Sequence, residues 1–270
     1  MLVLNLAATH HGCRGYNKRA LALPAGCGLC TLGLECLAHT VAGRKEDKVL
    51  KSILRPIPAV RQLSLARQRA QFHGSARFWE QRYAAGGTSG PGSYGDLARA
   101  KAQFLNSFVR DRDVKSIIEF GCGDGHQLSL ADYPSYIGLD VSRSAIKLCK
   151  TKFSTDESKS FYLYDGDCFV DHRQLLTADM AISLDVIFHL VEDRAYEQYM
   201  AHLFDAAERF TVIYATNAEI WDDAPHVRHR RFADWVGQHR DGWELTHTEA
   251  GSATGDRRAD FYVYERRRRS

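Results

Sequence analysis

A run of glycines and acidic residues marks the segment of this chain that is best suited to bind a ligand. Gly121, Gly123 and Gly125 follow an apolar stretch typical of a buried strand, and Glu119 stands two positions before the first of them. Glycines at a strand-to-helix turn let a ligand approach the backbone, where the free N–H groups of the following helix point at it. A second apolar run ends at Asp140, whose carboxylate can accept hydrogen bonds from a ribose diol. The spacing predicts a nucleoside-containing ligand across the ends of the first two strands.

The G-x-G-x-G spacing after a glutamate differs from the G-x-G-x-x-G fingerprint of dinucleotide-binding folds. It resembles motif I of the class I S-adenosylmethionine-dependent methyltransferases, and the resemblance covers roughly residues 76–265. It implies S-adenosylmethionine as the cofactor, with Asp140 binding the ribose. From the residues alone, Asp140 could instead cap the helix that starts near Ser142–Ser144. By the same resemblance, the glycine turn that lines the methionine part of the cofactor comprises Glu119, Gly121, Cys122, Gly123, Asp124 and Gly125.

Acidic residues also follow the third expected strand. In the family that the chain resembles, a residue at this place binds the adenine amino group, and Asp167 is our first choice, with Asp165 the second. An Asp-Gly turn is a common loop in its own right, so the residues alone leave both interpretations open.

Asp185 and His189 come at the end of the fourth expected strand and resemble motif IV, which faces both cofactor and acceptor in the family. Both are candidate catalytic residues. An imidazole titrates near neutral pH, so His189 is a candidate base for an attacking hydroxyl. The alternative is that His189 only shapes the pocket, because a sulfonium is already a good leaving group and alignment alone suffices for many methyl transfers.

Residues before the first strand are expected to fold over the cofactor, as such segments do in related enzymes. Tyr94 and Arg82 are the candidates there, and the guanidinium of Arg82 matches the methionine carboxylate. A packing helix with surface charges is the alternative.

A basic and aromatic segment lies after the fifth expected strand. Arginines bind carboxylates or phosphates and aromatic faces stack on sugar rings, so the segment predicts an acceptor site. A solvated helix face is the alternative. The candidate acceptor-binding residues are His226, Arg228, Arg230, Arg231 and Trp235.

Apolar runs alternate with helical segments through the rest of the chain, of which the clearest helix is 193–209. The pattern predicts an α/β fold with a doubly wound, mostly parallel seven-stranded sheet of the Rossmann-like methyltransferase type, whose last two strands form an antiparallel hairpin. The expected strands are 114–120, 135–140, 160–165, 179–186, 210–216, 243–249 and 260–265.

The first 75 residues differ from the rest in charge. They carry 11 Lys/Arg against 3 Asp/Glu, in a chain whose net charge is only +3. Residues 1–43 have no periodicity, which predicts a poorly ordered leader. Residues 44–75 predict a basic linker or an amphipathic segment suited to peripheral membrane contact. We expect the methyltransferase domain at 76–265 and a basic tail at 266–270.

Seven cysteines, an odd number, do not suggest a secreted disulfide framework, and the first residues lack the positive region of a secretory signal. A cytoplasmic protein is therefore expected. Cys27, Cys30, Cys36 and His39 lack the second ligand pair that structural zinc usually has, so no metal is expected.

The expected function is transfer of a methyl group from S-adenosylmethionine to an oxygen of a small molecule, such as a saccharide or secondary metabolite. Nucleic acid is not expected as a partner, because no domain suited to reading it by sequence is recognised. The basic leader keeps RNA methylation as an alternative, and a non-catalytic cofactor-binding scaffold is another.

Overall fold

The computed structural model describes residues 65, 67–68, 72–251, 253–254 and 257–267. All of them belong to one compact unit, Pro58–Ser270. The predictions for the leader 1–43, and for most of the basic segment 44–75, lie outside these residues. Within the described ranges, no helix combines the length and apolar character needed to cross a bilayer.

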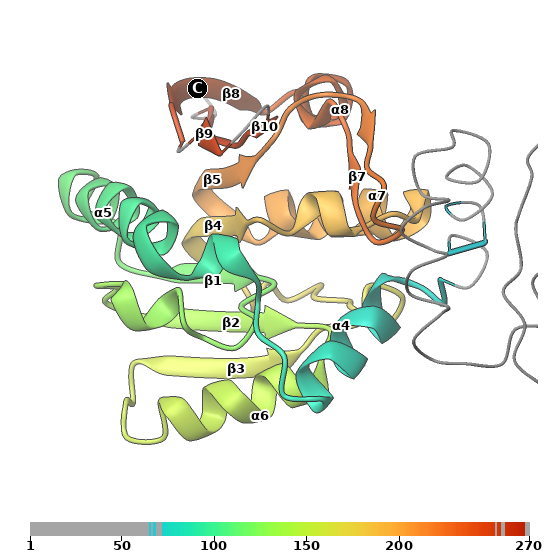
Figure 1. The fold of residues 1–270 in the computed structure, drawn as a ribbon. Helices are drawn as coiled ribbons and strands as arrows, with labels where there is room; N and C mark the ends of the chain where they lie inside the picture. The colour runs from blue at the N-terminus through green and yellow to red at the C-terminus, as the bar shows by residue number, and fades with distance from the viewer. Residues whose placement is uncertain (1–64, 66, 69–71, 252, 255–256, 268–270) are drawn as a thin grey trace, which may run out of the picture. The chain divides into compact units, whose positions relative to one another are not determined.

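The centre of the unit is a sheet of seven strands: β1 (Ile117–Phe120), β2 (Tyr136–Asp140), β3 (Lys159–Leu163), β4 (Ala178–Leu184), β5 (Ala207–Ala215), β8 (Trp243–Glu249) and β11 (Asp260–Arg266). Their order across the sheet is β3-β2-β1-β4-β5-β11-β8 (Figure 1). The strands from β3 to β5 are parallel, whereas β11 is antiparallel to both of its neighbours. The predicted doubly wound α/β fold with its antiparallel hairpin is confirmed.

Helices cover both faces of the sheet. Leu105 and Ile146 are buried on one face, and Phe204 and Phe232 on the other. Because both faces are covered, most residues of the central strands β1 and β4 are buried, as in other parallel sheets. The helices are α4 (Ser75–Ala84), α5 (Gly95–Asp111), α6 (Arg143–Lys152), α7 (Asp193–Asp205) and α8 (Phe232–His239), with short 3₁₀ helices η1 (Pro91–Ser93), η2 (Leu128–Leu130) and η3 (Ile187–His189).

Some boundaries differ from the sequence prediction. The helix expected over 193–209 ends at Asp205, because the chain turns there and enters β5 at Ala207. Arg266 belongs to β11 rather than to a tail, since it pairs with Trp243 of β8. Its guanidinium also donates to the carbonyl of Ala207 at 2.8 Å.

The order in which strands are added to the sheet reverses at β1. The connection from β1 leads to β2 on one side, and β4 lies on the other side of β1. The carboxyl ends of these strands therefore flank a topological switch point, where α/β sheets bind ligands. Helix α4 lies beyond these strand ends (Figure 1).

Candidate functional site

A cavity of about 690 Å³ opens at the switch point. Residues at the ends of β1, β2 and β4 line it, together with α4 and the segment around η1. Its volume lies in the range of small-molecule and cofactor sites. The candidate site residues that line it are Glu119, Gly121, Cys122, Gly123, Asp140, Asp165, Asp167, Asp185 and His189.

The glycine turn after β1 has a backbone that only glycine adopts without strain. Gly121, Gly123 and Gly125 have φ angles of 85°, 57° and 69°. A Cβ on Gly121 would lie 2.5 Å from Cγ2 of Val186, and one on Gly123 would lie 2.3 Å from Oγ of Ser89. The turn therefore needs glycine for its conformation and for the close approach of two neighbouring segments.

Asp140 ends β2 with its side chain buried against the glycine turn. Its carboxylate accepts hydrogen bonds from the backbone N–H of Gly123 at 2.9 Å and of Ser142 at 2.8 Å. The cap of α6 is Ser142 itself, whose Oγ accepts from the N–H of Ala145. Burial raises the pKa of Asp140 to about 6, although both backbone hydrogen bonds act to lower it. Asp140 therefore joins the turn to the start of α6 while lining the cavity.

Two more buried groups line the cavity with acceptor oxygens. Glu119 accepts a hydrogen bond from the hydroxyl of Tyr136, and burial raises the pKa of Glu119 to about 7. Gln127 donates through Nε2 to the carbonyl of Ala98 at 3.0 Å, whereas its buried Oε1 has no hydrogen-bond partner among the described residues. A ligand that donates hydrogen bonds would satisfy this oxygen. The sequence motif ends at Gly125 and did not mark Gln127.

Asp124 and Tyr94 hold the segment around η1 onto the glycine turn. Asp124 accepts from the N–H of Ser89 at 2.9 Å and from the hydroxyl of Tyr94 at 2.8 Å. Burial alone would raise the pKa of Asp124, but these hydrogen bonds and one from the N–H of His126 lower it. Neither Asp124 nor Tyr94 lines the cavity, whereas Ser89 does. Asp124 and Tyr94 therefore hold the segment around η1 in place and do not face the ligand space.

Arg82 does not line the cavity. Its Nε donates to the carbonyl of Thr88 at 2.6 Å, and its guanidinium lies 5.6 Å from the centre of the Trp79 ring. Trp79 and Tyr83, from the same helix, line the cavity instead. Helix α4 thus meets the cavity with its aromatic side chains, while Arg82 holds the loop that follows.

The acidic loop after β3 lines the cavity through Asp165 and Asp167. Asp167 is exposed and accepts from Arg194 at 2.7 Å and from Gln198 at 3.1 Å. Asp165 accepts from the N–H of Asp167 at 3.0 Å. Both candidates for the adenine contact therefore lie at the cavity.

His189 lies in η3, packed edge-on against Trp79 with 4.8 Å between ring centres. Its Nδ1 lies 3.0 Å from the carbonyl oxygen of His226. Because a carbonyl only accepts, Nδ1 carries the proton and Nε2 keeps its lone pair. Burial lowers the pKa of His189 to about 3, against the effect of that hydrogen bond. The imidazole is therefore uncharged at neutral pH.

Asp185 comes directly after β4 and has a left-handed backbone, with φ of 59°. Its Oδ2 accepts a hydrogen bond from Nζ of Lys101 at 2.5 Å. Lys101 lies in α5 and is 1% exposed, whereas the side chain of Asp185 is 21% exposed and lines the cavity. No motif marks Lys101 in the sequence, where it is one lysine on an amphipathic helix.

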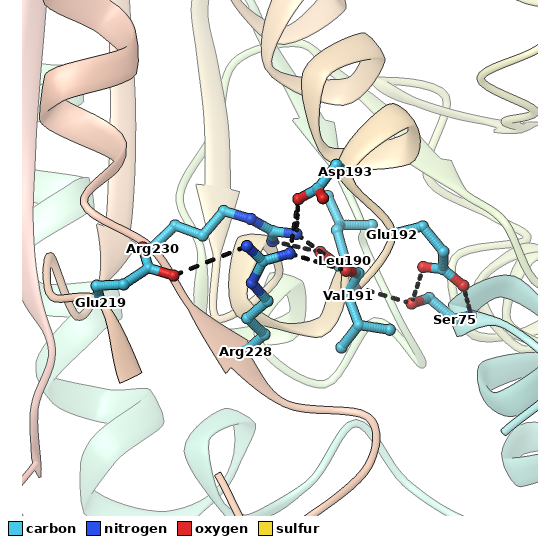
Figure 2. Close-up of polar contacts among 8 residues, drawn as sticks. All are labelled: Ser75, Leu190, Val191, Glu192, Asp193, Glu219, Arg228 and Arg230. Atoms are coloured by element: carbon cyan, nitrogen blue, oxygen red, sulfur yellow. Dashed lines mark hydrogen bonds and ion pairs between the residues drawn. The ribbon is translucent and has the colours of Figure 1, made fainter. Parts of the chain in front are cut away.

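Arg228 and Arg230, which the sequence suggested as acceptor ligands, bind the loop between η3 and α7 (Figure 2). Arg230 donates to the carbonyls of Leu190 at 2.6 Å and Val191 at 2.9 Å, and to Asp193 at 2.9 Å. Arg228 pairs with Asp193 at 2.6 Å. Neither arginine lines the cavity. Their guanidinium groups are used within the protein, where they fix the loop that follows His189.

The other three candidates of that segment also lie outside the cavity lining. His226 stacks on Phe78, with 4.2 Å between ring centres. Arg231 is exposed and pairs with Asp234 at 3.6 Å. Trp235 stacks on His239 at 4.7 Å between ring centres. The structure does not bring these side chains together around one ligand.

Two glutamates that the sequence did not mark fasten α4 over the cavity. Glu192 accepts from the N–H of Ser75 at 2.9 Å and from its Oγ at 2.7 Å, at the start of the helix (Figure 2). Glu80 accepts from the hydroxyls of Ser142 at 2.6 Å and Ser144 at 2.8 Å, which lower the pKa of Glu80 to about 2. The helix is held from two sides.

Among the residues with described positions, no group of three His, Cys, Asp or Glu side chains is arranged to hold a metal ion.

The chain is similar in sequence or in fold to known methyltransferases. No family model matches the chain. Over 112 residues it is 32% identical to a small RNA 2′-O-methyltransferase of Arabidopsis thaliana, a match that covers 37% of this chain and 12% of that protein. Among solved structures, it is similar to the N-methyltransferase NodS from Bradyrhizobium japonicum WM9 in complex with S-adenosyl-L-homocysteine. The TM-score is 0.56 at 14% identity, over 72% of this chain and 98% of that one.

The methyltransferase domain of bacterial CtHen1-C gives a TM-score of 0.53 at 18% identity, over 64% of this chain and 100% of that chain. The chain therefore has the fold of the class I S-adenosylmethionine-dependent methyltransferases, as the motif resemblance implied.

Proposed function

We propose that this chain transfers a methyl group from S-adenosylmethionine to a hydroxyl oxygen of a small, sugar-like acceptor such as a saccharide or secondary metabolite. The observation that carries the proposal is the cavity at the switch point. There the positive-φ glycine turn and the buried carboxylate of Asp140 lie side by side, joined by a hydrogen bond of 2.9 Å. A fold shared with a methyltransferase crystallised with S-adenosylhomocysteine supports the same cofactor.

The cavity residues fit that cofactor. Asp140 would accept from the ribose hydroxyls, and Asp167 from the adenine amino group. Near the glycine turn, Glu119 and the unpartnered Oε1 of Gln127 would receive the amino group of the methionine part. When bound, the cofactor supplies a methyl carbon activated by a positively charged sulfur.

The acceptor side is assigned to Asp185 and His189. The uncharged imidazole of His189 would shape the pocket beside the attacking oxygen. His189 is a poor proton acceptor at neutral pH, because burial depresses its pKa to about 3. The carboxylate of Asp185, which also lines the cavity, would therefore accept the hydrogen bond of the attacking hydroxyl and take its proton.

The basic segment has a different role in this proposal from the one its composition suggests. Arg228 and Arg230 would act by holding the loop beside His189, since their guanidinium groups are occupied by Asp193 and backbone carbonyls. His226 would act through its carbonyl, which fixes the tautomer of His189.

The test has two steps. Titration calorimetry with S-adenosylhomocysteine should show binding, and D140N should weaken it. A labelled-methyl assay over extracts of hydroxylated metabolites should then yield a product heavier by one methylene. Nicotinamide cofactor binding in place of S-adenosylhomocysteine would refute the proposal. Binding without product from any acceptor would favour the non-catalytic scaffold.

One observation favours a second candidate, methylation of a ribose 2′-hydroxyl in RNA. The relative at 32% identity is a small RNA 2′-O-methyltransferase. Both candidates place a sugar-type hydroxyl beside Asp185 and His189, so the chemistry is shared and the acceptor differs.

A matched pair of RNAs separates the two candidates. A short single-stranded RNA with a 3′-terminal ribose is compared with the same RNA ending in a 2′-deoxyribose. Methyl incorporation that needs the terminal 2′-hydroxyl, with binding that weakens steeply as salt increases, would establish the RNA candidate over the small molecule. No incorporation into either RNA would leave the small-molecule acceptor.

A further inference from the structure

A buried lysine supports the carboxylate at the acceptor side of the cavity. The side chain of Lys101 is 2% exposed, and its Nζ lies 2.5 Å from Oδ2 of Asp185. The ammonium also lies 5.2 Å from the centre of the Tyr214 ring. Lys101 does not line the cavity, whereas Asp185 does. The lysine therefore stands behind the carboxylate, on the side away from the ligand space.

The two carboxylate oxygens of Asp185 have different surroundings. Oδ2 accepts a hydrogen bond from the lysine, and it lies so near η1 that a Cβ added at Gly92 would be only 2.7 Å from it. Oδ1 accepts no hydrogen bond from any residue in the part of the chain that is described. The left-handed backbone at Asp185, with φ of 59°, is a conformation that costs energy in an aspartate. Several contacts thus combine to fix where this carboxylate points.

Stability alone gives little reason for such an arrangement. Removing two charges from water costs free energy that their mutual attraction often fails to recover, so an apolar pair of similar size would serve a core as well. A lysine with a partly exposed aspartate does something that an apolar pair cannot do. It presents a fixed negative charge to the cavity.

The position of this charge follows from the strand order. Asp140 ends β2 and Asp185 follows β4, on opposite sides of the glycine turn that follows β1. A cofactor whose ribose is held at Asp140 therefore extends its methionine part across the turn towards β4. The carboxylate of Asp185 then lies at the methyl end of the cofactor.

We propose that Lys101 is a positioning residue: its buried ammonium holds Oδ2 of Asp185 so that Oδ1 faces the methyl end of the cavity. This inference rests on the proposed function. Oδ1 accepts the hydrogen bond of the acceptor hydroxyl, and the same oxygen attracts any cation placed where the methyl group would be. The second property allows a test that does not need the acceptor.

Sinefungin is an analogue of S-adenosylmethionine that carries an amino group in place of the transferred methyl group. S-adenosylhomocysteine has neither the methyl group nor a positive charge at that position. A carboxylate facing the methyl position should make the wild-type protein bind sinefungin about tenfold more tightly, the gain from one charge-assisted hydrogen bond. The measurement is the ratio of the two Kd values by titration calorimetry. A change that only alters folding moves both affinities together and leaves the ratio unchanged.

Three variants test which residues produce the preference for sinefungin. D185N keeps the side-chain shape and tolerates the left-handed backbone, because asparagine favours that region; it should reduce the ratio to about one. K101M should also reduce it, because the carboxylate is no longer held. K101M/D185N removes both charges and so avoids an unpaired buried ion. It should fold while keeping a ratio of about one. K115M, at a lysine that is 69% exposed, is the matched control and should keep the wild-type ratio.

The outcomes distinguish the two proposals. If the wild-type protein binds neither ligand, the proposed function fails. If it binds both with equal affinity, the proposed function stands and the orientation of Asp185 is wrong. If K101M keeps or increases the preference for sinefungin, Lys101 does not position the carboxylate. If the double variant regains the wild-type ratio, the pair is structural only.

Discussion

The two sides of the cavity are built in different ways. On the β1–β2 side, the ligand space is shaped by backbone. The N–H of Gly123 in the glycine turn donates a hydrogen bond to Asp140, 17 positions further on. On the β4 side it is shaped by side chains from distant segments. Lys101 meets Asp185 across 84 positions, Arg230 meets Leu190 across 40, and Ser75 meets Glu192 across 117.

This difference explains which roles could be assigned from the sequence. A backbone-shaped site leaves a short motif, because the glycines must stand at fixed spacing in one turn. Contacts between side chains of distant segments leave no motif, although the strand end that carries Asp185 and His189 resembles one. Arg230 has the composition of a ligand-binding arginine, but its partners are Leu190, Val191 and Asp193. If the comparison is right, changes on the β1–β2 side should act mainly on cofactor affinity and changes on the β4 side mainly on stability or turnover.

The largest effect is expected for Gly121→Ala. The new Cβ would lie 2.5 Å from Val186 at a φ of 85°, so the turn must move away from its ligand-binding shape. S-adenosylhomocysteine affinity should fall by roughly 100-fold or more. The control is Gly237→Ala in α8, where a Cβ meets nothing within 4 Å. That variant should bind normally and gain about 0.5–1 kcal/mol of stability. Normal binding by Gly121→Ala would contradict the backbone-shaped site.

Asp140→Asn comes next and carries a pH signature. Loss of the buried carboxylate should weaken S-adenosylhomocysteine binding by about 1–3 kcal/mol. In the wild-type protein the ionised carboxylate is the better acceptor, and its pKa is raised to about 6. Affinity should therefore fall as the pH decreases through about 6, and this step should be missing in Asp140→Asn. Calorimetry between pH 5 and 8 tests both points. A step that persists in the variant would assign it to Glu119, whose pKa is raised to about 7.

Arg230→Met should mainly lower stability. It leaves the carbonyl of Leu190 without its donor and that of Val191 with only the 3.5 Å contact from Arg228, at a cost of about 1–3 kcal/mol in the free energy of unfolding. Arg231→Met is the neighbouring control, because Arg231 is exposed, and should change stability by less than about 0.5 kcal/mol. Urea unfolding measures both. If Arg231→Met abolishes methyl transfer while Arg230→Met does not, direct acceptor binding by the segment is supported instead.

The smallest effect is expected for Glu80→Gln. Hydrogen bonds from Ser142 and Ser144 lower the pKa of Glu80 to about 2 from 4.5. Its contribution to stability is therefore present above about pH 4.5 and is lost as the pH falls towards 2. Because the carboxylate is close to solvent, we expect only a two- to threefold faster release of S-adenosylhomocysteine at neutral pH. Stopped-flow release measures this, with the exposed Glu157→Gln as control. Equal release rates in all three proteins would show that this contact does not hold α4.

The sequence by itself determined the seven strands, the antiparallel hairpin and the glycine turn. These follow from signals a few residues long: apolar runs, and glycines where the backbone needs positive φ. It also placed Asp140, Asp185 and His189 at the strand ends that meet around the cavity.

Only the tertiary structure decided the partners of the charged side chains. Lys101, Glu80 and Glu192 carry no local signal, and the roles of Arg228 and Arg230 depend on a loop far from them in the chain. The physical reason is that backbone conformation is set by neighbouring residues. An ion pair is set by whichever segments the folded core brings within a few ångströms.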